Sequence, residues 1–258
     1  MRKYGWKKDR VDHRDHIFMA RRREADTPDS DLRALCPLVY DQGDLGSCTA
    51  NAIAGAVEFE QRKQQLPDAC TPSRLFVYYN EREMENSVDE DSGASLRDGI
   101  KSIASLGVCP EPEWPYVIGQ YRTKPPQSCY DHALKHQALE YARVSQGIEP
   151  LRACLADGFP IVFGFTVYRS FESPEVARNG MVSMPGFFEK PVGGHAVVLV
   201  GSLRVTKQFI VRNSYGEAWG KAGYFFMPFD YVCNIRMASD FWTIRLVERG
   251  DEGETNGA

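Results

Sequence analysis

The sequence predicts an α+β fold, with a helical first half and a strand-rich second half. Over residues 31–126, apolar residues recur at helical spacing behind helix start signals, whereas residues 127–247 contain short β-rich runs bounded by Gly, Pro or Asn. A proline-rich connection, 110–126, separates the two patterns. Helices followed by strands are typical of α+β proteins. With 258 residues, 43% of them hydrophobic, the chain can bury a substantial core.

Three helices are expected where the sequence contains signals for a helix start or a helix end. One begins at Thr71-Pro72, since proline is favoured at the first helical position. Another begins at Ser95, where Asp98 completes a capping box, and ends at Gly107. A short helix is expected over 148–157 in the second half.

Three β-rich runs are expected in the second half, at 161–167, 195–200 and 208–212. Each is rich in Val, Ile or Phe and is bounded by residues that favour turns. The last residues, 248–258, are rich in Gly and acidic side chains, so we expect them to be disordered.

The first 30 residues form a basic leader that differs in charge from the rest of the chain. Residues 1–23 contain nine Lys or Arg and three Asp, a net charge of +6, whereas the remainder has 22 basic and 32 acidic residues, a net charge of −10. The end of the leader is polar with small residues and proline, which predicts a linker. We therefore expect ordered structure to begin near Asp31.

Composition and cysteine spacing exclude several function classes. The net charge of −4 argues against a nucleic-acid partner. No apolar run has the length of a signal peptide or a membrane span, so we expect a cytoplasmic protein with no membrane partner, with export by a non-classical route as the alternative. The chain contains seven cysteines and no C-x-x-C pair, which favours mostly reduced thiols. They stand at positions 36, 48, 70, 109, 129, 154 and 233.

Cys48 stands in the first turn of a predicted helix, with Ser47 as its N-cap. The helix is predicted from one buried stripe at helical spacing, formed by Ala50, Ile53, Ala54 and Val57. A helix N-terminus favours an anion through its partial positive charge and its open N–H groups, and a cysteine is nucleophilic only as thiolate. Cys48 is therefore a candidate nucleophile, with a small buried residue as the alternative reading.

His195 and Asn213 are candidates for the base and for the residue that orients it. His195 follows two glycines, which permit close approach of a ligand, and opens an apolar strand, so that its ring can project from a strand end. The Asn213 carbonyl can accept from the outer imidazole nitrogen, and Tyr215 and Trp219 can shield that bond from water. A structural histidine and a turn asparagine are the alternatives.

Three segments containing these residues resemble, in the same order, the signature blocks of the papain family. They are Gln42–Ala50, Gly194–Ala196 and Asn213–Tyr224. Asp31–Arg33 resembles the start of a mature papain-like enzyme, and the resemblance spans about residues 31–245. Two further runs, Ser73–Tyr79 and Gly107–Tyr116, are most similar to the bacterial xylellain-type branch.

The resemblance implies a two-lobed fold with the active site in the cleft between the lobes. It implies a helical left lobe, 31–126, bearing Cys48, and a β-barrel-like right lobe, 127–247, bearing His195 and Asn213. Gln42 is expected to donate to the oxyanion beside the Cys48 N–H. The resemblance also implies substrate-binding roles, assigned to Gly93, Gly194 and Trp219.

The sequence departs from the papain pattern at three positions near these residues. Thr49 follows the nucleophile where the family usually has Trp, and Tyr215 replaces the Trp that usually covers the asparagine. Leu45 stands where papain has a disulfide cysteine. No reacting group is lost, but rates and side-chain preferences do not carry over.

The expected reaction is hydrolysis of a peptide or protein substrate through a Cys48 thioester, with no metal or cofactor. A thiolate paired with imidazolium is expected to hold the cysteine pKa far below the ~8.5 of a free thiol. We hypothesise that residues 1–30 are a short inhibitory pro-segment, held partly by positive charge and carrying the processing candidate Arg21-Arg22-Arg23. A solvated tail is the alternative.

Three other functions compete with the peptidase hypothesis. The same triad can serve an acyl transferase, and a papain-like fold without activity can serve as a binding module. A metal site is the third, because Cys129 lies near His132 and His136, which are four residues apart and share a helix face. The histidine pair lacks the glutamate of a metalloprotease helix, so we favour a solvated face.

Overall fold

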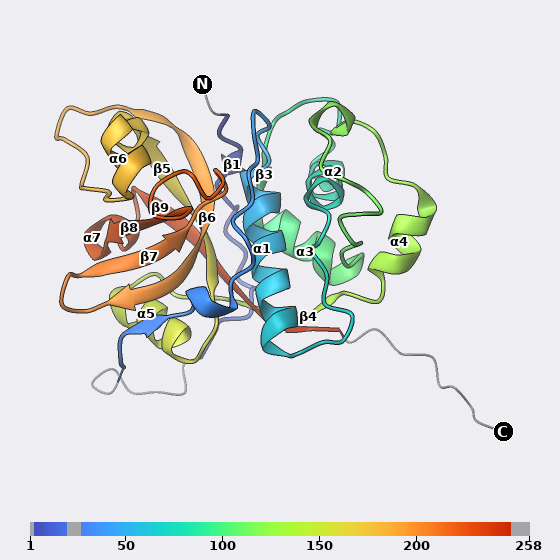
Figure 1. The fold of residues 1–258 in the computed structure, drawn as a ribbon, viewed down its shortest axis with the longest axis horizontal. Coiled ribbons are helices and arrows are strands. Elements are labelled where there is room, and N and C mark those ends of the chain that lie inside the picture. The colour runs from blue at the N-terminus through green and yellow to red at the C-terminus, as the bar shows by residue number, and fades with distance from the viewer. Residues whose placement is uncertain (1–2, 20–26, 249–258) are drawn as a thin grey trace.

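The computed structural model describes residues 3–19 and 27–248, which form a helical lobe and a sheet lobe side by side (Figure 1). The helical lobe contains α1 (Cys48–Lys63), α2 (Arg74–Met84), α3 (Leu96–Ser105) and α4 (Gln127–Ala133). The sheet lobe carries the small helices α5 (Ile148–Ala156), α6 (Pro174–Asn179) and α7 (Phe229–Val232). Single 3₁₀ turns lie at Arg33–Leu35, Ile118–Gln120 and Arg169–Glu172.

The sheet lobe is built on a seven-stranded antiparallel sheet of order β4-β9-β5-β6-β7-β8, with β2 pairing β6. The strands are β2 (Ser30–Asp31), β4 (Ala138–Arg143), β5 (Ile161–Tyr168), β6 (Pro191–Leu203), β7 (Gln208–Arg212), β8 (Tyr224–Pro228) and β9 (Ala238–Val247). The sheet is open, because β4 and β8 pair only with β9 and β7 within its path. The α+β class is confirmed, and the right lobe is an open sheet rather than a closed barrel.

The two faces of β6 belong to different cores. Val198 and Val200 pack with Ile53 of α1 between the lobes, whereas Val197 and Leu199 pack beneath α5 inside the sheet lobe. This alternation follows from the two-residue period of side chains along a strand. The strand therefore joins the lobes, and a residue of β6 with the parity of Ala196 faces α1.

One of two predicted helix starts changes in the structure. α2 begins at Arg74 instead of Thr71-Pro72, because the Ser73 hydroxyl accepts from the Phe76 N–H and caps the helix there. α3 is capped as predicted by Ser95, whose hydroxyl accepts from the Asp98 N–H at 3.2 Å. The return bond of the capping box is absent, since Asp98 accepts from the hydroxyl instead of the backbone.

The β-rich runs are found, with one extension that concerns the site. β7 has the predicted bounds, but β6 begins at Pro191 and places His195 in its fifth position. The two glycines before it, Gly193 and Gly194, continue the pairing with β5. His195 therefore lies inside a strand rather than at its end, where the apolar run alone suggested it.

The leader is ordered well before Asp31, so the expectation that structure begins there is wrong for residues 3–19. Its short strand β1 (Trp6–Lys7) pairs in parallel with β3 (Ala94–Ser95), between the two lobes (Figure 1). The Arg21-Arg22-Arg23 candidate and most of the predicted disordered tail lie outside the described residues. Among the described residues, no helix has the length and apolar character needed to span a membrane.

Candidate active site

Cys48 is the first residue of α1 and is fully buried. Ser47 holds the N-cap position, but its side chain does not cap the helix, which corrects the prediction. With φ −98° and ψ 27°, the Ser47 backbone is not extended, and its hydroxyl bonds to Tyr116 and accepts from Asn51 Nδ2 instead. No side-chain cap therefore competes with the sulfur for the first-turn N–H groups.

His195 and Asn213 meet as the sequence predicted. His195 Nε2 lies 2.8 Å from Asn213 Oδ1, which also accepts from the Ser214 N–H at 2.9 Å. Tyr215 stacks on the imidazole at 4.9 Å between ring centroids, and Trp219 packs edge-on against Tyr215. All but Trp219 are buried, so the hydrogen bond is shielded from water.

The thiol and the imidazole come from opposite lobes to one place. The backbone of Ala196, the residue after His195, lies within hydrogen-bonding reach of the Cys48 thiol. The leader connects the same two groups, since Gly5 also reaches the thiol and the Tyr4 ring lies 6.0 Å from the imidazole. The helix start of α1 and the strand β6 thus meet across the cleft.

Burial under the leader raises the pKa of the Cys48 thiol to about 11, although backbone hydrogen bonds from Ala196 and Gly5 oppose the shift. This is opposite to the low thiol pKa expected from the sequence. The difference has a physical cause, because a thiolate loses its hydration when a peptide covers it. The closed cleft therefore favours the neutral, weakly nucleophilic form.

Gln42 is buried and oriented by three contacts. Its side-chain oxygen accepts from the Ser214 hydroxyl at 2.7 Å, and its amide nitrogen donates to the Leu45 carbonyl at 2.9 Å. The same nitrogen donates to the leader carbonyl of Lys3 at 3.3 Å. Sequence reasoning missed Ser214, although its position directly after Asn213 was a signal. Gln42 therefore presents an N–H to a carbonyl that lies in the cleft.

The leader runs through the cleft in an extended conformation, with alternate side chains on alternate walls. Its odd residues face the helical lobe, where Lys3 pairs with Asp91 at 2.8 Å and Lys7 pairs with Glu85 at 2.7 Å. Gly5 lies between these lysines, and a Cβ there would stand 1.7 Å from the Gly46 carbonyl oxygen. Only glycine lets the backbone pass this close to the start of α1.

The predicted substrate-binding glycines contact this segment. A Cβ on Gly93, whose φ is +66°, would stand 1.9 Å from the Gly5 carbonyl oxygen. A Cβ on Gly194 would stand 2.8 Å from the Trp6 ring. Trp219 packs instead against Phe171 and Tyr215. The structure thus brings both glycines to the cleft and places Trp219 behind the histidine.

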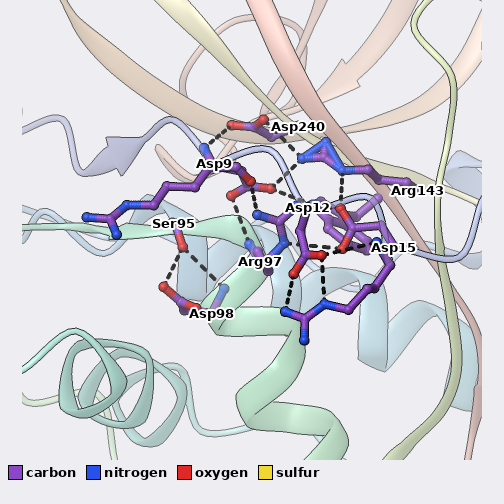
Figure 2. Close-up of polar contacts among 11 residues, drawn as sticks. Asp9, Asp12, Asp15, Ser95, Arg97, Asp98, Arg143 and Asp240 are labelled. Atoms are coloured by element: carbon purple, nitrogen blue, oxygen red, sulfur yellow. Dashed lines mark hydrogen bonds and ion pairs between the residues drawn. The ribbon is translucent and has the colours of Figure 1, made fainter.

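Beyond β1 the leader is held by buried ion pairs (Figure 2). The Asp9 carboxylate accepts from the Arg97 N–H and pairs with Arg143 at 2.8 Å. Asp15 pairs with both arginines, and Arg143 also reaches Asp240 at 3.3 Å. These pairs have the opposite polarity to the one expected, because here the leader supplies the acids and the body supplies the bases.

The competing metal site does not assemble. His132 Nδ1 lies 2.7 Å from Glu113, His136 lies 3.7 Å from Asp68, and Cys129 packs with Cys109 in a small apolar cluster. No group of three or more potential ligands gathers anywhere in residues 3–19 and 27–248. All seven cysteines are unbridged thiols.

Comparison with known proteins identifies the family. Residues 27–242 match the papain family of cysteine proteases. An uncharacterized peptidase C1-like protein of Acanthamoeba polyphaga mimivirus is 50% identical over 215 residues, covering 80% of this chain and 69% of the relative. Cathepsin L 1 of Paramecium tetraurelia is 26% identical over 219 residues, 80% of this chain and 60% of the relative. The chain spans 54% to 69% of the length of the curated relatives it matches.

Solved structures agree with this assignment. Xylellain, a cysteine protease from Xylella fastidiosa, superposes with a TM-score of 0.90 at 42% identity, covering 96% of this chain and 98% of xylellain. The predicted likeness to the xylellain-type branch is confirmed by this match. A procathepsin B from Trypanosoma congolense shares the fold alone, with a TM-score of 0.75 at 16% identity over 95% of this chain and 86% of that one. The chain belongs to the papain family of cysteine proteases and is a cysteine-type peptidase, a hydrolase.

Proposed function

We propose that Cys48 is the nucleophile of this peptidase, with His195 as its base and acid and Asn213 as the residue that orients the imidazole. The 2.8 Å contact between His195 Nε2 and Asn213 Oδ1 supports this assignment, because a hydrogen bond to one ring nitrogen fixes the orientation of the imidazole. The thiolate attacks the scissile carbonyl and the imidazolium protonates the leaving amine. Water activated by the imidazole then hydrolyses the thioester.

Gln42 is proposed to donate to the oxyanion of this reaction together with the Cys48 N–H. The 3.3 Å contact from Gln42 Nε2 to the Lys3 carbonyl supports the role, since it places the amide opposite a peptide oxygen in the cleft. A donor in this position stabilises charge that develops when the thiolate attacks. Ser214 is proposed to hold Gln42 in place through the 2.7 Å hydrogen bond to its carbonyl.

The leader is proposed to inhibit this site in the same chain. The observation that carries the proposal is the fit of Gly5, which reaches the Cys48 thiol and leaves no room for a side chain beside Gly46. While the leader is in place, a substrate carbonyl has no access to the sulfur. Residues 1–30 would then act as a pro-segment, and activity requires that they leave the cleft.

Substitution of Gly5 in the full-length chain tests the inhibitory role of the leader and the assignment of Cys48 as the nucleophile. Gly5→Ala places a methyl group against the Gly46 carbonyl, so we expect hydrolysis of a casein or peptide-library substrate to rise at least about tenfold over wild type. Gly119→Ala is the matched control, because a Cβ there meets no atom within 4 Å. Adding Cys48→Ala to Gly5→Ala is expected to remove the gained activity.

The outcomes separate the competing functions. A Gly5→Ala chain that equals wild type would end the inhibitory role, and activity that survives Cys48→Ala would end the nucleophile assignment. Ligated products in the same mass spectra would indicate transfer to an amine acceptor instead of hydrolysis. Failure to cleave any peptide, with the fold retained by circular dichroism, would favour a binding module.

A further inference from the structure

A largely buried carboxylate joins two backbone segments on the helical wall of the cleft. Gly46, two residues before Cys48, donates its N–H to Asp91 Oδ1 at 2.9 Å. The Asp91 side chain is 10% exposed and lies two residues before Gly93. A Cβ on Gly46 would stand 3.0 Å from the same oxygen, so a side chain there would crowd the carboxylate. The segment that leads into Cys48 is therefore tied to a later loop of the same lobe.

Tyr78 of α2 completes this connection. Its side chain is fully buried, and its hydroxyl donates to the same Asp91 oxygen at 2.5 Å and accepts from the Gly93 N–H at 3.2 Å. Burial raises the pKa of Tyr78, so the hydroxyl keeps its proton and remains a donor. The two bonds strengthen each other, because they run in one direction from the amide through the hydroxyl to the carboxylate. Since all seven cysteines are free thiols, these side chains join the Gly46 and Gly93 segments without a disulfide.

The leader backbone passes between the two segments that Tyr78 and Asp91 join. A Cβ on Gly5 would stand 1.7 Å from the Gly46 carbonyl oxygen, and a Cβ on Gly93 would stand 1.9 Å from the Gly5 carbonyl oxygen. The Ala94 N–H, next to Gly93, donates to the Gly5 carbonyl at 2.8 Å. The gap between Gly46 and Gly93, here called the backbone slot, is therefore a close fit for one peptide backbone.

The groups that hold the backbone slot belong to the body of the protein. When the leader leaves, Asp91 loses the ion pair with Lys3 at 2.8 Å but keeps the hydrogen bonds from Gly46 and Tyr78. Although burial opposes the charged form, the hydrogen bonds that Asp91 accepts lower its pKa, which favours the carboxylate as the shared acceptor. An empty slot therefore keeps the connection that sets its width.

We propose that Tyr78 and Asp91 are positioning residues of the peptidase, which hold the backbone slot at the width that aligns a substrate backbone with the Cys48 thiol. This inference rests on the proposed function, because it assumes that a substrate backbone follows the path of Gly5. Loss of the Tyr78 hydroxyl loosens the Gly93 side of the slot. Loss of the Asp91 carboxylate loosens that side and also the segment that leads into Cys48.

Peptide hydrolysis in a chain with a weakened leader tests this assignment. The background is the full-length chain with Lys3→Ala and Gly5→Ala, in which the leader has lost its own ion pair to Asp91 and its fit beside Gly46. Substitutions of Asp91 therefore cannot act by removing that ion pair. Titration of Cys48 with an epoxide-type inhibitor counts the open sites, so that kcat is given per open site in every variant.

Tyr78→Phe tests the Gly93 side of the slot. The variant keeps the ring that packs against Arg82 and removes only the hydroxyl, which leaves the Gly93 N–H without this acceptor. We expect KM for a fluorogenic peptide to rise about tenfold while kcat changes less than about twofold, because substrate binding is weakened and the reacting groups are intact. Tyr79→Phe is the matched control, since that hydroxyl lies 3.5 Å from Glu83 at the surface, and its KM should equal that of the background.

Substitutions of Asp91 test both sides of the slot together. Asp91→Ala removes the shared acceptor, so we expect kcat/KM to fall about 10²-fold, with a lower kcat as well as a higher KM, because the thiol and the scissile carbonyl are no longer aligned. Asp91→Asn keeps an oxygen that can accept from Gly46 and Tyr78 and should recover most of this loss.

Alkylation of Cys48 by iodoacetamide separates positioning from general damage to the site. This small reagent does not use the backbone slot, so its rate in Tyr78→Phe should stay within about twofold of the background chain. Any of three results would overturn the assignment: a KM in Tyr78→Phe equal to that of Tyr79→Phe, an alkylation rate that falls as far as kcat/KM, or Asp91→Asn as slow as Asp91→Ala. A background chain that cuts no peptide would instead refute the peptidase proposal on which the inference rests.

Discussion

The two walls of the cleft hold the leader by different physical means. On the helical wall, the leader offers Lys3 and Lys7, whose side chains stay 56% and 42% exposed in their ion pairs. On the sheet wall, Tyr4 and Trp6 lie over glycines, which have no side chains. Tyr4 covers Gly193, and Trp6 covers Gly164 and Gly194. Exposed ion pairs contribute ~0–1 kcal/mol each, whereas full burial of an aromatic side chain contributes ~1.5–3 kcal/mol, of which the half-buried Tyr4 and Trp6 gain a part. The sheet wall therefore supplies the larger share of the contact energy.

The same contrast separates the chemistry of the walls. The helical wall contributes the sulfur at a helix start, and the sheet wall contributes the imidazole and its shielding rings. On the proposed assignment, neither wall is reactive alone. A leader that bridges both walls is therefore proposed to block the reaction by occupying the space in which they meet.

Removal of the imidazole from the sheet wall is expected to have the largest effect. In the Gly5→Ala background, His195→Ala should lower kcat/KM about 10²- to 10⁴-fold, because general acid–base catalysis is lost. His132→Ala is the matched control, since that histidine is exposed and pairs with Glu113 at the surface. Peptide hydrolysis at neutral pH measures the loss of kcat/KM in each variant, and equal losses in the two variants would contradict the assignment.

The second-largest effect on hydrolysis is expected from the buried ion pairs beyond the cleft. Arg143→Leu leaves Asp9 and Asp15 without a principal partner, and a buried carboxylate without its base is costly. The leader can avoid this cost by leaving the body, so we expect basal hydrolysis to rise about tenfold or more. Arg236→Leu, at an exposed arginine, should change little. Equal basal rates in the two variants would show that this network does not hold the leader.

The lysines of the helical wall should have a smaller, salt-dependent effect. Lys3→Ala with Lys7→Ala removes two exposed ion pairs, so we expect basal hydrolysis to rise about two- to tenfold at low salt. Because exposed charges are screened, most of this difference should vanish near 0.5 M NaCl. A gain that is equally large at high salt would mean that the lysines act through something other than charge.

The helical wall also contains a titrating acid, with the smallest expected effect. Burial raises the pKa of Glu81 to about 8, and its carboxylate accepts from Thr49, the neighbour of Cys48, at 2.5 Å. The folded protein therefore keeps a proton that the unfolded chain loses above its pKa of about 4.5, so stability should fall as pH rises through this window.

Substitution of Glu81 isolates its share of this pH dependence. Glu81→Gln should reduce the loss of Tm between pH 5 and pH 8.5 by about 2–4 °C, while Glu83→Gln, at an exposed position, should not. A remaining slope is expected, because burial also raises the pKa of Glu60 to about 7. An identical slope in wild type and Glu81→Gln would contradict the burial of a protonated carboxyl.

Local signals in the sequence were sufficient for much of the fold. Ser95 marks its helix because the cap is formed by residues three apart, and the strand Gln208–Arg212 is bounded by its own turn residues. The prediction that Ser47 caps its helix is wrong, because its hydroxyl is hydrogen-bonded to Tyr116, which is distant in the sequence. The extra residues of β6 were missed because Gly193 and Gly194 lower strand propensity while pairing with β5.

The site also contains a part that local sequence signals predicted and a part that depends on tertiary contacts. Cys48, His195, Asn213 and Gln42 stand in recognisable blocks, so their order in the chain was informative. Contacts made by the leader depend on tertiary structure, since its partners are scattered over three later segments. The net charge of the leader even suggested the wrong polarity for its buried pairs. Charge counts describe the average surface and cannot locate the few acids that become buried.

The reaction of Cys48 with an epoxide-type cysteine-peptidase inhibitor tests the central claim most directly. Wild type and Gly5→Ala are treated in parallel, and the label is located by mass spectrometry of the intact chain and its peptides. We predict one equivalent, on Cys48 alone, acquired at least about tenfold faster in Gly5→Ala because the thiol is uncovered. Equal labelling rates in the two chains, or label on another of the seven cysteines, would contradict the account.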